Sequence, residues 1–372
     1  MKALLKVNLL YIFLLFIIWR LLTLISSQIS VFFISQKDEF TGKLFSFNNL
    51  LPNLWTFANF DGEHYLWISQ YGYRQFENVF FPGYPFLTRF VALFLKDHLL
   101  SAILISNLCL LVLLFFLYKL FLLDFKKEAV YKGLILFLAF PSSFFLGFVY
   151  SESLFLLLVT LSFYFARRNK LFLASFFGGL SSLTRLVGIF TIFSTYLIWK
   201  EVNKKKKTLF LLSIIVSSFG VILFFNWKFS GDPFSFLNSQ SLVSTNRTTT
   251  EIILLPQVIF RYLKIFVTAD FSYNYTIALQ EFFLTLVFLL VIVKNFKKMR
   301  KEYLFYSLFV VILPTLTGTL SSMPRYLLAA FPLYFYGATS IKSRFLFAII
   351  VIMFMLIQLI NTAFFVSGYW VS

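Results

Sequence analysis

The stretch "NLLYIFLLFIIWRLLTLISSQISVFF", residues 8–33, is apolar at 19 of its 26 positions. A run of this kind can cross a bilayer as a helix, which needs about 20 apolar residues. Similar runs recur throughout the 372 residues, of which 60% are hydrophobic, 22% aromatic and only 13% charged. A soluble core of this length could not bury so much apolar surface. The composition therefore predicts an all-α, polytopic integral membrane protein.

The net charge of +18 comes largely from short basic segments between the apolar runs. Basic loops of this kind mark the cytoplasmic side of a membrane protein. We expect these clusters to set the topology, with membrane lipids rather than nucleic acid as the surrounding partner. The clusters are Lys126, Lys127 and Lys132; Arg167, Arg168 and Lys170; 204–207; Lys294, Lys297, Lys298, Arg300 and Lys301; and Lys342 and Arg344.

Eleven crossings place all five basic clusters inside, with the N-terminus cytoplasmic and the C-terminus outside. Between two basic clusters, 171–199 is expected to form two short helices that meet at Thr184–Arg185, because a single crossing there would break the charge rule. Short helices of this kind usually line protein-walled cavities. The other helices are expected at about 8–33, 99–123, 133–149, 153–166, 208–226, 277–294, 303–320, 326–340 and 345–366.

We expect one domain over 1–372, with no internal repeat and no soluble domain. The long first outer loop, about 34–98, has amphipathic and aromatic spacing in 40–57 and 64–76. Segments of this type lie along the membrane surface as interfacial helices. A second large outer loop is expected at about 228–275.

The first outer loop contains "NFDGEHYLWISQYGYRQFENVFFPGYP", residues 59–85. Asp61 is expected at the outer membrane face between Phe60 and Tyr65, where partial desolvation raises the pKa of a carboxyl group. A carboxylate in that condition suits a general base. Asp61 is therefore the candidate catalytic base, and the alternative is an ordinary solvated loop acid.

Two further side chains of this stretch are candidates for substrate binding. Glu63 is expected to project differently from Asp61 on an extended loop and to act from a supporting position. His64 could donate to a phosphate or orient Asp61, or it could simply pack at the interface. Asp61 and Glu63 could hold a divalent cation, although a general base needs no metal. With only two histidines and one cysteine, Cys109, the sequence offers no other metal framework.

Three more ionisable residues occur where apolar ones are expected. Glu152 lies in "YSES" between two helices, Arg185 lies at the tip of the short helices, and Arg325 follows a proline at the outer start of 326–340. Ionisable groups at such depths indicate function by default. Arginine suits phosphate because its planar fork can bind two oxygens at once. The alternative is a structural ion pair between Glu152 and either arginine.

Arg20 lies midway along the first expected helix, and two roles for it are open. Its side chain could snorkel to the cytoplasmic face, as long basic side chains do near membrane boundaries. It could instead have a partner inside the protein. The sequence does not decide between them.

These residues together predict a lipid-linked sugar as the substrate. No glycine-rich phosphate loop and no nucleotide-binding domain occur, so an activated donor should be lipid-borne. One base, two guanidiniums and many aromatics fit sugar transfer, since the base takes a hydroxyl proton while the arginines stabilise the departing lipid phosphate. The alternatives are a flippase or transporter of a lipid-linked substrate and a catalytically silent scaffold.

The same segments resemble those of the PIG-V-like mannosyltransferases, the family that contains the second mannosyltransferase of GPI-anchor synthesis and prokaryotic relatives. The family pattern W-D-x-x-x-Y, then G-Y, then F-F-P-x-Y-P, is similar to "FDGEHYLWISQYGY" and "FFPGYP". Its N-P-(A/S)-S…Y-S-E-S is similar to "FPSSFFLGFVYSES". Its L-T-R and R-(Y/F)-L…F-P are similar to "LTR" at 183–185 and "RYLLAAFP" at 325–332. The motifs keep the family's order over about 55–335.

The resemblance implies a GT-C fold and inverting transfer of a sugar, usually mannose, from a polyprenyl- or dolichyl-phosphate donor on the extracytoplasmic side. It makes Asp61 the first carboxylate of the family's acidic motif. Substrate-binding positions are then assigned to Glu63, His64, Tyr65, Glu152, Arg185, Arg325 and Tyr326. The acceptor is expected to be a lipid or glycan.

Two residues depart from the family pattern. Phe60 stands where the family often has tryptophan, which affects sugar stacking. Phe140 stands where it often has asparagine, which removes a polar group near the pocket. The heavy use of Phe, Lys and Asn is typical of an AT-rich prokaryotic genome. The expected location is therefore a bacterial or archaeal plasma membrane.

Overall fold

The computed structural model describes residues 2–37, 54–75, 77–200, 205–243 and 251–371. Across these ranges the regular structure consists of sixteen α-helices and four short 3-10 helices, and no strand occurs in them. The prediction of an all-α protein is confirmed.

In the described ranges, five helices are long and apolar enough to cross a membrane. This finding confirms the prediction of an integral membrane protein with several membrane-spanning helices. The other helices are shorter, so the number of eleven crossings stays a prediction. The five are α1 (Lys2–Phe33, apolar from Leu9), α4 (His98–Phe121), α9 (Lys205–Ser230, apolar from Leu211), α12 (Tyr273–Asn295) and α16 (Arg344–Val366).

Two expected helices are interrupted at prolines. The helix expected at 133–149 is wrong as a single element, because α5 (Lys127–Ala139) ends before Pro141 and a 3-10 helix, η3 (Ser143–Gly147), follows. The helix expected at 326–340 divides into α14 (Met323–Ala329) and α15 (Pro332–Ser340). Proline disfavours helical backbone at the residue before it, which accounts for both breaks.

The broken segment between two basic clusters is confirmed. It forms α7 (Leu171–Ser182), the 3-10 helix η4 (Leu186–Phe190) and α8 (Thr191–Lys200). The chain turns at 183–185, where the backbone of Arg185 is extended. The helices expected at 153–166 and 303–320 correspond to α6 (Glu152–Arg167) and α13 (Lys301–Thr315).

The two segments expected as large outer loops contain several short elements. The first has η1 (Leu54–Ala58), α2 (Asp61–Tyr71), η2 (Glu77–Val79) and α3 (Gly83–Leu95). The interfacial segment expected at 40–57 lies mostly outside the described residues. The second has α10 (Ser235–Val243) and α11 (Leu255–Thr268), which was expected only as loop. One side of α11 is strongly apolar, as in interfacial helices.

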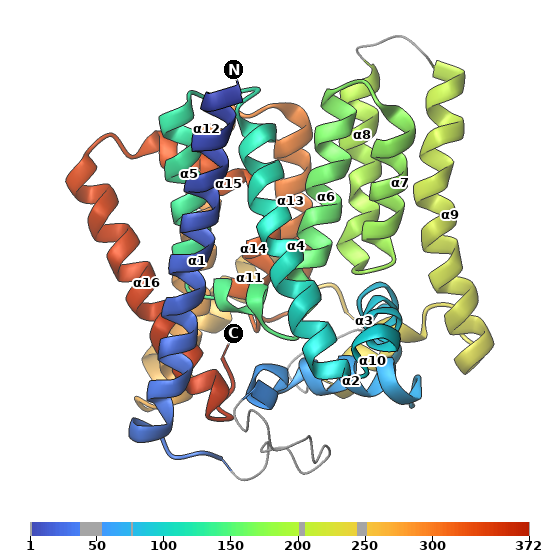
Figure 1. The fold of residues 1–372 in the computed structure, drawn as a ribbon. Coiled ribbons are helices and arrows are strands. Elements are labelled where there is room, and N and C mark those ends of the chain that lie inside the picture. The colour runs from blue at the N-terminus through green and yellow to red at the C-terminus, as the bar shows by residue number, and fades with distance from the viewer. Residues whose placement is uncertain (1, 38–53, 76, 201–204, 244–250, 372) are drawn as a thin grey trace. The chain divides into compact units, whose positions relative to one another are not determined.

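The described residues form two compact units. The first contains the described residues within 1–72, 82–160 and 338–371, and the second contains those within 73–81 and 161–337. In the first unit α1, α4 and α5 run alongside one another, and α16 packs against α1 and α5 (Figure 1). In the second unit α7 packs against both α8 and α9. A single domain over 1–372 stays a prediction.

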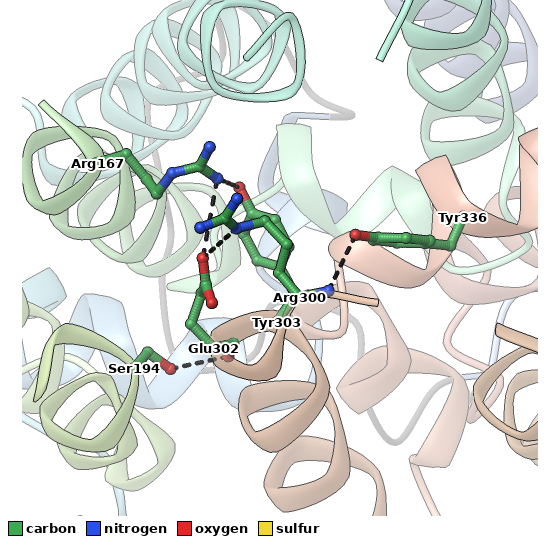
Figure 2. A network of polar contacts seen from close by, with 6 residues as sticks. All are labelled: Arg167, Ser194, Arg300, Glu302, Tyr303 and Tyr336. Carbon is green, nitrogen blue, oxygen red and sulfur yellow. Dashed lines mark hydrogen bonds and ion pairs between the residues drawn. The ribbon is translucent and has the colours of Figure 1, made fainter. Parts of the chain in front are cut away.

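A buried carboxylate joins two basic clusters in the second unit (Figure 2). Glu302 is 5% exposed, and its Oε1 lies 2.5 Å from Nε of Arg300 and 3.9 Å from Nη1 of Arg167. Arg167 also donates to the hydroxyl of Tyr303 at 3.2 Å, and the backbone N–H of Arg300 donates to the hydroxyl of Tyr336 at 3.2 Å. These two arginines therefore connect α6, α13 and α15, a structural role beyond setting topology.

Candidate functional site

The candidate base begins a helix. Asp61 is the first residue of α2, and Glu63 lies in the same first turn. The expectation that Asp61 and Glu63 lie on an extended loop was wrong, because the chain turns at Phe60 and enters the helix directly. Acidic residues in the first turn are stabilised by the unpaired N–H groups and the helix dipole. The start of a helix is therefore a favourable place for the negative charge that a carboxylate base carries.

The candidate residues of this stretch lie on different faces of α2. Each residue of an α-helix is rotated about 100° from the one before, so positions three and four apart share a face. His64 and Tyr65 therefore lie on the same side of α2 as Asp61, while Glu63 projects about 200° away from Asp61. This arrangement keeps His64 available to orient Asp61 and places Glu63 on another face of α2.

Tyr65 links two of the sequence motifs. Its hydroxyl lies 3.1 Å from Oγ of Ser151, in a contact buried within the first unit. Ser151 immediately precedes Glu152, which begins α6 and is 3% exposed. The structure thus brings "DGEHY" and "YSES" together, as expected if both motifs serve one site.

Close packing around Gly62 explains why the acidic motif contains a glycine. A Cβ atom at this position would lie 3.1 Å from the carbonyl oxygen of Val149 and 3.3 Å from Cβ of Ala58. Any larger side chain would push α2 away from the segment that leads into "YSES". The small residue therefore allows the close approach of the two motifs.

In the second unit, two candidate arginines meet on one aromatic ring. The guanidinium carbons of Arg185 and Arg325 lie 5.6 and 5.9 Å from the ring centroid of Tyr326. Arg185 precedes η4 and Arg325 belongs to α14, so residues far apart in the sequence are brought together. A cation within about 6 Å of an aromatic centroid is attracted to the ring. The three residues assigned to phosphate or sugar binding therefore form one cluster.

A buried carboxylate that sequence analysis did not single out holds the segment leading to Arg325. Glu281, on α12, is 5% exposed. Its Oε1 accepts from the backbone N–H of Ser322 at 3.0 Å, and its Oε2 accepts from the hydroxyl of Tyr262 at 2.8 Å. The hydroxyl of Tyr262 in turn accepts from the backbone N–H of Leu320 at 3.1 Å. Glu281 and Tyr262 thus fix the chain just before α14.

The phenol of Tyr262 suits this role. It lies on α11, outside the five long apolar helices. Burial, and then the neighbouring carboxylate of Glu281, raise the pKa of the phenol, which therefore stays a hydrogen-bond donor. The sequence did carry a signal for this pair, since an acid within an apolar helix needs a partner.

Arg20 has an internal partner. Its guanidinium carbon lies 5.3 Å from the ring centroid of Phe57 and 6.0 Å from that of Phe148. The two rings stack on each other with their centroids 4.3 Å apart. Among the described residues, the buried Nη1 of Arg20 has no hydrogen-bond partner. The structure therefore decides against snorkelling and places Arg20 beside the segments that lead into both acidic motifs.

The candidate residues fall into two groups. Asp61, Glu63, His64, Tyr65 and Glu152 belong to the first compact unit, and Arg185, Arg325 and Tyr326 belong to the second. Within the described ranges, no three side chains of His, Cys, Asp or Glu gather closely enough to hold a metal ion. The expectation that both groups line one cavity stays a prediction.

Comparison with known proteins adds no relative, since neither a protein-family model nor a curated protein matches the chain. The resemblance to PIG-V-like mannosyltransferases therefore rests on the order and spacing of its motifs. Family membership stays a prediction, and the functional argument depends on the side chains described above.

Proposed function

We propose that the protein is an integral-membrane glycosyltransferase of GT-C type. It moves a sugar, mannose by resemblance, from a polyprenyl- or dolichyl-phosphate donor to a hydroxyl of a lipid or glycan. The observation that carries the proposal is the pair of guanidiniums, Arg185 and Arg325, on the ring of Tyr326. Paired guanidiniums bind phosphate oxygens, and an aromatic face suits a sugar ring or a prenyl chain.

The proposed reaction needs no chemical group beyond the donor, the acceptor and the protein's side chains. The acceptor hydroxyl gives its proton to the carboxylate of Asp61 while its oxygen attacks the anomeric carbon of the donor sugar. The bond from that carbon to the phosphate oxygen breaks, and the lipid phosphate leaves with the electron pair. Arg185 and Arg325 stabilise the charge on the departing phosphate. Attack opposite the leaving group inverts the anomeric centre, and a divalent cation, if bound, would add to the positive charge there.

The proposal also sets an orientation in the membrane. Eleven crossings, if the protein has them, place Asp61, Glu152, Arg185 and Arg325 at the extracytoplasmic side of a bacterial or archaeal plasma membrane. The basic clusters then face the cytoplasm, in keeping with the positive-inside rule. A lipid-borne donor reaches this side without any soluble nucleotide sugar.

Transfer by the purified protein in liposomes tests the proposal. Labelled polyprenyl-phosphate sugars, offered one at a time with a lipid or glycan acceptor, should yield labelled product from at least one donor. Arg185→Gln and Arg325→Gln should each lower kcat/KM for that donor about 10- to 100-fold, in line with loss of a charged hydrogen bond of about 1.5–3 kcal/mol. Arg344→Gln is the matched control, because Arg344 is exposed at the start of α16.

Two outcomes would contradict the proposal. Movement of labelled lipid across the bilayer without product would support the flippase alternative. Product could instead form equally fast in the Arg185, Arg325 and Arg344 variants. The protein would then still be a glycosyltransferase, but Arg185 and Arg325 would have no part in the mechanism.

A further inference from the structure

The residue directly before Asp61 has a backbone conformation that bulky side chains rarely adopt. Phe60 has φ 60° and ψ −120°. The backbone N–H of Gly62 donates to the carbonyl of Asn59 at 3.4 Å, which closes a turn with Phe60 at its second position. These angles belong to the second position of a type II′ turn, where glycine is strongly favoured. Such strain persists only where surrounding structure imposes it, and it concentrates at functional sites.

Hydrogen bonds to two distant segments hold this turn. Asn59 is 1% exposed, and its Nδ2 donates to the carbonyl of Phe365 at 2.9 Å. The carbonyl of Asn59 also accepts from the hydroxyl of Tyr150 at 2.8 Å. Tyr150 comes just before "SES", and Phe365 lies at the end of α16. The peptide before Phe60 is therefore fixed from both sides within the first unit.

The ring of Phe60 is also held. Its centroid lies 5.3 Å from that of Trp370, edge to face, and 5.5 Å from that of Phe365. Edge-to-face aromatic pairs at these distances are favourable. The segment 365–370 lies beyond the motifs that carry the family resemblance, which end at about 335. No pattern in the sequence connects this segment with the acidic motif.

We propose that Phe60 is a positioning residue for Asp61, held in its left-handed conformation by Tyr150 and by the segment 365–370. The turn at Phe60 decides where α2 begins, and so it sets the direction of the carboxylate of Asp61 in the first turn. A residue with ordinary backbone angles would let this first turn rotate or unwind. This inference rests on the proposed function, in which Asp61 is the base.

A matched pair of variants separates positioning from simple stability. Phe60→Ala and Phe60→Gly both remove the ring, but only glycine relieves the backbone strain. The Gly variant should therefore melt at a higher temperature than the Ala variant, yet its kcat should be lower, because its turn is freer to move. Tyr150→Phe removes only the hydroxyl that fixes Asn59. It should lower kcat several-fold, with KM for the donor unchanged.

The experiment measures melting temperature, kcat and KM for wild type and the three variants in the same liposome assay. Activity that follows stability, with Gly above Ala in both, would overturn the positioning role. A Gly variant no more stable than the Ala variant would overturn the strain itself, without any need for activity. If wild type transfers no sugar from any donor, the proposed function fails, and the role of Phe60 fails with it.

Discussion

Gly188 offers the sharpest structural test of how Arg185 is placed. It lies in η4, three residues after Arg185, and its backbone N–H donates to the carbonyl of Arg185 at 2.9 Å. A Cβ atom on Gly188 would lie 2.4 Å from both the carbonyl carbon and the oxygen of Ser181, and 2.5 Å from the nitrogen of Ser182. These are backbone atoms of the end of α7, so no side-chain rotation can relieve the contact.

The cost of Gly188→Ala can be worked from these distances. Real Cβ contacts essentially never fall below 3.0 Å, so η4 and α7 must separate by at least about 0.6 Å, and by about 1 Å to reach ordinary contact. Overpacking of this kind costs about 1–3 kcal/mol, and sometimes more. We therefore expect a lower melting temperature in detergent, and a lower kcat/KM because Arg185 moves with η4.

Gly220→Ala is the matched control, because Gly220 is an exposed residue within α9 and a Cβ there meets nothing within 4 Å. Replacing a glycine within a helix by alanine stabilises by about 0.5–1 kcal/mol. The reasoning would be refuted if Gly188→Ala were as stable and as active as Gly220→Ala. A fall in stability without any change in activity would show that Arg185 does not depend on this packing.

Substitutions at three further positions test other parts of the structure, each by thermal unfolding in detergent. Glu281→Leu should destabilise by about 2 kcal/mol or more, because it removes the acceptor of the buried Ser322 N–H and the nearer partner of the Tyr262 hydroxyl, and Glu281→Gln should recover part of the loss. Glu302→Gln should cost about 1–3 kcal/mol through the loss of its ion pairs, the one with Arg300 being partly screened by solvent. Arg20→Met should leave stability unchanged or raise it by about 1 kcal/mol, since the cost of a buried cation exceeds the lost cation–π contact. Opposite signs at Glu281, Glu302 or Arg20 would contradict the contacts described for that residue.

Hydropathy and charge predicted most of the helices, because the bilayer limits the length of an apolar helix and the charge rule limits the number of crossings. The helices expected at 99–123, 277–294 and 345–366 agree with α4, α12 and α16 to within a few residues. The breaks before Pro141 and Pro332 could also have been predicted, since proline marks them in the sequence. Hydropathy alone hides such breaks because the residues on both sides are apolar.

The candidate site could be predicted only by residue type. Arginines at 185 and 325 were expected to act together, but only the fold shows that they share the ring of Tyr326. The extended loop expected around Asp61 was wrong because Phe60 takes a glycine-like turn. Partners from α16 and from the segment before α6 impose that turn. Contacts over such long sequence separations leave no local pattern.

The most direct measurement of the central claim is the rate of sugar transfer by Asp61→Asn. Wild type and variant would be reconstituted at equal amounts of folded protein, with the donor that wild type uses. Asp270→Asn is the control, since it removes an exposed carboxylate between α11 and α12. If Asp61 is the base, its substitution should lower kcat by about 10²- to 10⁴-fold, and Asp270→Asn should change little. Transfer by Asp61→Asn at the wild-type rate would contradict the account.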